Sequence, residues 1–256
     1  MIDRYINGVI DQVYKRVGMT DRNIVMACYS NDFSIRCNDA VKTHSLEDEN
    51  VFFAWKEFDV DHITGAYEPF LDVVCDSFRK YGDGNFEDFM EECGVYQLQR
   101  ETLRSYYETG RCVRPEHILL DEVKYERERM TEAIESMLRK MADKKPIVIV
   151  INRFQLASGS AMQLLMSLLN KPSMNIGMVL AVNENHFRQD EISADWESIK
   201  ERIEDNAQMY HFGSTGIRRA DTEGTDDQHE NFKDYLRQIS NTIELLDFEQ
   251  AKRFCR

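Results

Sequence analysis

The sequence predicts an α/β protein: a five-stranded parallel sheet flanked by helices, with a helical insertion after the second strand. Segments of strand and helix pattern alternate along the chain, as they do when helices join parallel strands. The segment 147–151 is β-branched and uncharged, which is typical of a strand buried on both faces. Residues 64–145, in contrast, carry only helical patterns.

The first part of the core is predicted from apolar spacing. Residues 2–17 place apolar side chains at three-and-four spacing, which predicts an amphipathic helix. A short buried strand is expected at 23–29. It is followed by a helix with Phe33, Cys37, Ala40 and Val41 on one side, and by an aromatic-rich strand at 51–58.

The insertion is expected to contain several helices, the last of them long, charged and beginning near Glu116. Two apolar stripes support this: Phe70, Leu71, Val74 and Phe78, and then Met130, Ile134, Met137, Leu138 and Met141.

After the insertion, the pattern returns to alternating strands and helices. Strands are expected at 147–151, 176–182 and 208–212, and helices at 158–169 and 194–205. Residues 213–229 are expected to form a mobile loop, and 232–254 are helical in pattern. We therefore predict an α/β core at 1–64 and 146–227, a helical insertion at 65–145 and C-terminal helices at 228–256.

Composition narrows the classes of function. The chain has 32 basic and 46 acidic residues, a net charge of −14, so we expect no binding to nucleic acid or to anionic membranes. We expect no signal peptide, because the first residues are amphipathic rather than uniformly apolar. No apolar run of 18 residues is present, and the six cysteines form no CxxC pair. We expect free thiols in the cytoplasm and no metal, since a zinc site would need His44 or His117 to join scattered cysteines.

Three segments resemble the STAND and AAA+ class of P-loop NTPases, over roughly residues 1–212. The strand 147–151 and the following residues 152–158 look like a Walker B strand with its loop and helix. The strand 177–182, ending in Asn183 and Glu184, looks like a sensor-1 strand. Residues 66–72 resemble the start of the helical insertion that many STAND proteins carry after their second strand.

The residues that a working NTPase of this class needs are replaced. After the first strand, residues 30–36 contain no glycine and no lysine, and Asp32 would repel a triphosphate. Where Walker B requires an acid for magnesium, the chain has Asn152 and then Arg153. The resemblance therefore implies a degenerate nucleotide site, with Asn183 as a remnant of sensor 1, and we expect neither a cofactor nor catalysis.

The C-terminal residues 243–251 resemble the turn inside a tetratricopeptide helical pair. One half-repeat cannot bury its own apolar face, so we expect helical repeats to continue in a longer polypeptide. The apolar stripe of residues 232–254 is expected either to fold back on the domain or to mediate self-association.

Other candidate sites have simpler explanations. Asp59, Asp61 and His62 follow the second strand and suggest a metal or acid–base site, but strand-end capping explains them better. Arg218 and Arg219 suggest an arginine finger, although a solvated pair is expected. Residues 157–161, which include Ser158 and Ser160, lack the GxSxG pattern, so Ser158 is expected to be a helix N-cap.

The functional prediction is a non-catalytic, NTPase-like regulatory or scaffolding module of a larger, bacterial-type signalling protein. Its partners are expected to be other proteins or downstream domains of the same chain, and homo-oligomer formation is one of the two outcomes that remain open for residues 232–256. Two alternatives remain open: a nucleotide-binding protein that lacks a Walker A motif and holds ATP through Asn183, and a hydrolase that uses Asp59 and Asp61.

Overall fold

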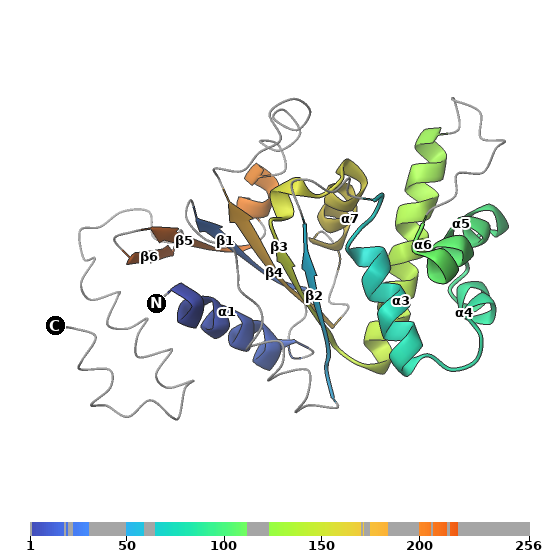
Figure 1. Ribbon diagram of the computed structural model, residues 1–256, viewed down its shortest axis with the longest axis horizontal. Coiled ribbons are helices and arrows are strands. Elements are labelled where there is room, and N and C mark those ends of the chain that lie inside the picture. The colour runs from blue at the N-terminus through green and yellow to red at the C-terminus, as the bar shows by residue number, and fades with distance from the viewer. Residues whose placement is uncertain are drawn as a thin grey trace. The chain divides into compact units, whose positions relative to one another are not determined.

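The structure, a computed structural model, describes residues 2–17, 19, 23–30, 50–58, 65–111, 123–169, 171, 175–183, 200–205, 207–213 and 216–219. All of them belong to one compact unit, Met1–Arg219 (Figure 1). The elements in chain order are α1 (Ile2–Arg16), β1 (Ile24–Ser30), β2 (Phe52–Glu57), α3 (Phe70–Tyr81), α4 (Phe86–Glu92), α5 (Gln97–Thr109), α6 (Val123–Lys144), β3 (Ile147–Asn152), η2 (Phe154–Leu156), α7 (Gly159–Leu169), β4 (Ile176–Asn183), β5 (Gln208–Gly213) and β6 (Gly216–Arg219). Residues 200–205 are also helical.

These elements form a mainly parallel sheet flanked by helices, which confirms the predicted α/β class. The strand order is β2-β3-β4-β1-β5-β6. The strands β2, β3, β4 and β1 form the contiguous parallel centre, and β5 pairs in parallel with β1. The strands β3 and β4 lie side by side in this order.

The expected number of five strands is wrong, because β6 adds a sixth strand antiparallel to β5. Gly213 pairs with Gly216, so the chain reverses there within a very short connection. The expected loop at 213–229 is therefore wrong for residues 216–219. Its glycines mark a reversal between paired strands, and Arg218 and Arg219 are strand residues that pair with His211 and Tyr210.

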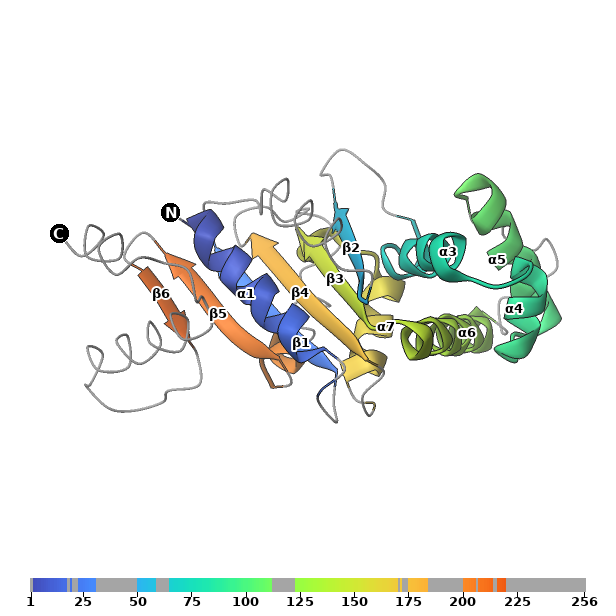
Figure 2. The same cartoon turned by 90° about the horizontal axis from the view of Figure 1, so that it is seen from below.

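The two faces of the sheet are covered by different helices. On one face, Ile147, Ile149 and Ile151 of β3 belong to a core shared with α3, α6 and α7. On the other face, α1 packs against β4, β1 and β3 (Figure 2). All six residues of β3 are buried, as expected for a strand covered on both sides.

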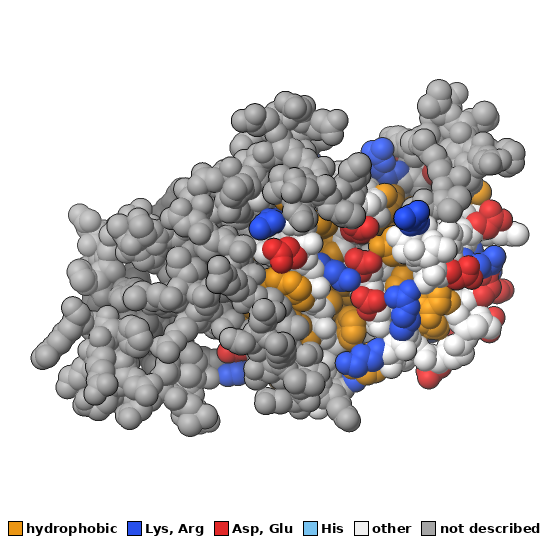
Figure 3. All heavy atoms as spheres, in the orientation of Figure 1, with side chains coloured by type: hydrophobic (Ala, Val, Ile, Leu, Met, Phe, Trp, Pro, Cys, Tyr) orange, Lys and Arg blue, Asp and Glu red, His pale blue; other side chains and the backbone are white. Residues whose placement is uncertain are grey.

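The predicted helical insertion is confirmed for its described residues, and α3, α4, α5 and α6 form a lobe beside the sheet (Figure 1). The stripe Phe70, Leu71, Val74 and Phe78 is buried. In α6 the four apolar residues from Ile134 to Met141 are buried, and Met130 packs against the same core. Acidic and basic side chains are interspersed over the surface of this lobe (Figure 3).

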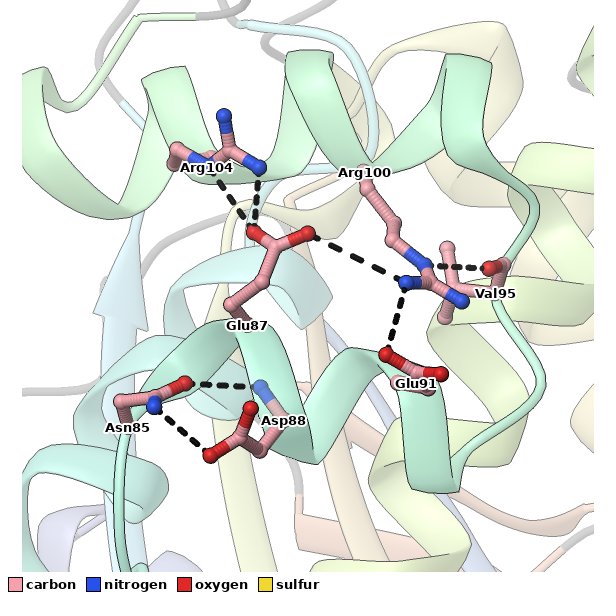
Figure 4. Close-up of polar contacts among 7 residues, drawn as sticks. All are labelled: Asn85, Glu87, Asp88, Glu91, Val95, Arg100 and Arg104. Carbon is pink, nitrogen blue, oxygen red and sulfur yellow. Dashed lines mark hydrogen bonds and ion pairs between the residues drawn. The ribbon is translucent and has the colours of Figure 1, made fainter.

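Ion pairs hold the lobe's surface helices together. The Arg104 guanidinium contacts the carboxylate of Glu87 on α4, with Nε donating to Oε2 at 2.8 Å. Arg100 lies 3.3 Å from Glu91 and donates through Nε to the Val95 carbonyl at 2.7 Å (Figure 4). Asn85 caps α4 by accepting a hydrogen bond from the Asp88 amide. The contacts of Arg100 and Arg104 with Glu91 and Glu87 thus join α5 to α4 at the surface of the lobe.

Several sequence predictions fall outside the described residues. They concern the helix with Phe33 and Val41, the start of a helix near Glu116, the first part of the helix at 194–205, and the C-terminal helices at 228–256. In the described part of the chain, α6 begins at Val123.

Candidate functional site at the carboxyl edge of the sheet

The carboxyl ends of the parallel strands lie at one edge of the sheet, which is where ligands bind in open α/β sheets. The strand register aligns these ends: Glu57 of β2 is opposite Asn152 of β3, and Ser30 of β1 is opposite Asn183 of β4. The residues matched by resemblance to the Walker B and sensor-1 positions, Asn152 and Asn183, are therefore at the same edge.

At the end of β3, the side chain of Asn152 forms a hydrogen bond with its neighbour on β2. Its amide nitrogen donates a hydrogen bond of 3.0 Å to Oε1 of Glu57. Asn152 is only 1% exposed, whereas the Glu57 side chain is 44% exposed. The carboxylate in this contact thus comes from β2, and one of its oxygens accepts a hydrogen bond from the Asn152 amide.

Arg153 adds a cation to the same contact. Its Nη2 atom lies 3.8 Å from Oε1 of Glu57, and its Nη1 atom donates to the Phe58 carbonyl at 3.4 Å. The Phe58 amide in turn donates to the Asn152 carbonyl at 3.2 Å. The ends of β2 and β3 are therefore joined by backbone and side-chain contacts, and Glu57 is balanced by a guanidinium.

The backbone of Arg153 explains how the chain leaves β3. This residue has φ 56° and ψ 45°, the left-handed conformation that ordinary residues rarely adopt. It leads into η2, whose Phe154, Gln155 and Leu156 are all buried. Residues in such conformations cluster at functional sites and switches, so the connection from β3 to α7 is a feature to test.

The serine hydroxyls at the start of α7 form hydrogen bonds with backbone amides and lie within hydrogen-bond distance of each other. Ser158 accepts a hydrogen bond from the Ala161 amide at 3.3 Å, which confirms the predicted N-cap. The hydroxyl oxygens of Ser158 and Ser160 lie 3.2 Å apart, and Ser160 also accepts from the Tyr67 amide. The contacts described for Ser158 are therefore those of a helix cap.

At the end of β1, a lysine side chain lies near a buried tyrosine ring. Tyr29 is 1% exposed, and the Lys200 ammonium of the helix at 200–205 lies 5.7 Å from the centre of its ring. This is a cation near the strand end after which a phosphate-binding loop would begin. On the other face of the same strand, burial raises the pKa of the Cys28 thiol, so Cys28 remains protonated.

Other predicted site residues lie outside the described part of the chain. These are Asp32, Asp59, Asp61 and His62, together with the side chains of Asn183, Arg218 and Arg219. Among the described residues, no group of three or more His, Cys, Asp or Glu side chains is placed to hold a metal ion.

Sequence reasoning missed Glu57 and Lys200. The signal for Glu57 was available, because it is the last residue of β2 and aligns with Asn152 in a parallel register. Lys200 carried no comparable signal, since its position over Tyr29 depends on how the helix at 200–205 packs across β1.

Comparison with protein-family models gives no match, and comparison with curated proteins gives no significant similarity. In the ranges that the structure describes, no helix is long and apolar enough to cross a membrane.

Proposed function

We propose that this chain is a non-catalytic, NTPase-like module of a larger signalling protein and that it acts through contacts with other proteins. The observation that carries the proposal is the pairing of Asn152 and Arg153 with Glu57. A magnesium-dependent NTPase needs an acid free to hold the metal at the end of β3. Here that position carries an amide and a guanidinium.

The strand order supports the resemblance on which this proposal rests. The strand matched to sensor 1, β4, lies between β1, which would precede the phosphate-binding loop, and β3, which is matched to Walker B. A nucleotide site built from the ends of these three strands requires them to be neighbours, as they are here. The helical lobe between β2 and β3 is likewise where a STAND insertion is expected.

Protein contacts are favoured by the surface of the helical lobe. Tyr96 and Tyr125 are each 61% exposed, and the Arg129 guanidinium lies 5.4 Å from the centre of the Tyr96 ring. Tyrosine and arginine are among the residues that most often contribute binding energy at protein interfaces. The lobe therefore presents side chains suited to a protein partner.

Calorimetric titration with ATP and magnesium, together with a phosphate-release assay, tests the loss of nucleotide function. We expect no binding at micromolar nucleotide and no hydrolysis, because residues 30–36, where the phosphate-binding loop would lie, contain no glycine and no lysine to compensate a triphosphate. A clear micromolar isotherm would overturn the proposal that the nucleotide site is lost.

Lys200 favours a second candidate, a magnesium-independent nucleotide-binding protein. Its ammonium lies near the end of β1, where a phosphate would be bound. If ATP binds without magnesium, Lys200→Met should weaken binding at least tenfold. Lys140→Met, which removes an exposed lysine paired with Glu92 in the lobe, is the matched control and should leave binding unchanged.

A further inference from the structure

Tyr67 connects three parts of the domain through three different atoms. Its amide donates to the Ser160 hydroxyl of α7 at 3.3 Å, and its phenol hydroxyl donates to the Arg127 carbonyl of α6 at 3.2 Å. Its carbonyl accepts from the Leu71 amide at 3.2 Å, at the start of α3. The residue therefore bridges the connection after β3 and two helices of the lobe.

The backbone of Tyr67 is strained. Its φ of 63° lies in the left-handed region, which is unfavourable for a bulky aromatic residue, and its side chain is buried. Such a conformation persists only while its surroundings hold it in place. The contacts with Ser160, Leu71 and Arg127 supply that restraint, so loss of one of them favours return to an ordinary backbone conformation.

The Ser160 contact lies a few residues from the candidate site. Asn152 ends β3, Arg153 leads into η2, and the Ser158 and Ser160 hydroxyls lie at the start of α7. The segment that joins the end of β3 to Ser160 is short, and its residues Phe154, Gln155 and Leu156 are buried. On the other side of Tyr67, the Arg127 carbonyl belongs to the second turn of α6, where residues 127–129 are exposed.

We propose that Tyr67 is a positioning residue that couples the β3–α7 connection to the first turns of α6. A ligand or partner that displaces Ser160 releases the Tyr67 amide, the backbone relaxes, and the hydroxyl leaves the Arg127 carbonyl. The first turns of α6 are then less restrained. This coupling is independent of nucleotide binding, so it stands or falls separately from the proposed function.

Amide hydrogen exchange of the full chain, followed by mass spectrometry, tests the coupling. Tyr67→Phe removes the bond to α6 directly, and we expect about fivefold faster exchange in a peptide covering residues 127–134. Ser160→Ala touches no atom of α6, yet we expect a similar acceleration in that peptide. The double variant should exchange no faster than Tyr67→Phe, because the link is already broken.

Ser105→Ala is the matched control. It removes the hydroxyl of a serine in α5 that donates to the Arg111 carbonyl at 3.2 Å. It should leave residues 127–134 unchanged. The proposal is overturned if Ser160→Ala does not alter exchange there, or if the two effects multiply to about 25-fold in the double variant.

Loss of the fold would be recognised by faster exchange in β3 and β4 as well. In that case the Ser160→Thr variant replaces Ser160→Ala as the test of the coupling, because it keeps the hydroxyl. If residues 127–134 of the Ser160→Thr variant exchange at the wild-type rate, the coupling is supported. Faster exchange in these residues overturns the proposal.

Discussion

A β-carbon added at Gly177 would lie 2.3 Å from Cγ1 of Val13. Gly177 belongs to β4 and Val13 to α1, so the absence of a side chain at 177 sets how closely the helix approaches the sheet. Val13 is fully buried and β-branched, which leaves it few alternative rotamers. This contact places α1 against the central strands.

Gly177→Ala should therefore lower the free energy of unfolding by about 3 kcal/mol, because overpacking a filled core forces helix and sheet apart. Urea denaturation followed by circular dichroism measures the change. Gly159→Ala is the control: nothing lies within 4 Å of a β-carbon there, so its effect should stay within about 1 kcal/mol of zero. Equal unfolding midpoints for Gly177→Ala and wild type would contradict the packing argument.

Lys171 and Glu135 form an ion pair between the end of α7 and α6. The Glu135 side chain is 5% exposed, and its second oxygen has no hydrogen-bond partner among the described residues. Lys171→Met should cost about 3 kcal/mol of unfolding free energy, since it leaves a buried carboxylate without its cation.

The double variant Glu135→Leu with Lys171→Met should recover most of that loss, because neither charge remains. Chemical denaturation of the two single variants and the double variant provides the cycle. Additive single effects would show that the pair is not coupled.

Asn152→Asp would place a second carboxylate within hydrogen-bond distance of Glu57. Like charges at that separation disfavour ionisation, so the variant should be destabilised by about 2 kcal/mol at pH 7 and by less at pH 4. It should also fail to gain ATP hydrolysis, because an acid alone does not rebuild the phosphate cradle.

Urea denaturation at the two pH values checks this effect. Gln97→Glu adds the same charge at an exposed position of α5 and serves as the control. A destabilisation by Asn152→Asp that does not depend on pH would point to packing rather than charge.

Burial raises the pKa of the Cys93 thiol from 9.0 to about 11, with Lys140 opposing the change and Glu92 adding to it. The thiol form is thus favoured in the folded state. The stability linked to this group is present below about pH 9 and is lost as pH rises toward 11.

Iodoacetamide labelling of Cys93, measured by peptide mass spectrometry, should keep increasing between pH 9 and 11 in the folded chain. In urea the midpoint of the labelling profile should return to about pH 9. A folded-state midpoint near pH 9 would contradict the effect of burial.

The sequence pattern was sufficient to predict a strand or helix where the element is buried along its whole length. The uninterrupted β-branched run of β3 and the apolar stripe of α3 identified their elements, since each pattern repeats with the period of the backbone itself. The same reasoning placed Ser158 at the start of α7. It failed at 216–219, because a four-residue strand is too short to show a period and its flanking glycines suggested a loop.

The sequence alone therefore determined the α/β class, the helical insertion and the presence of an amide and a guanidinium, Asn152 and Arg153, at the end of the third strand. These properties depend on the local spacing of apolar residues and on the identity of single residues. Only the tertiary structure decided that Asn152 and Arg153 engage Glu57, that Lys200 lies over Tyr29 and that Tyr67 joins α6 to α7. Each of these relationships joins residues that are 60 or more positions apart, or depends on strand register, and chain folding rather than local spacing brings such residues together.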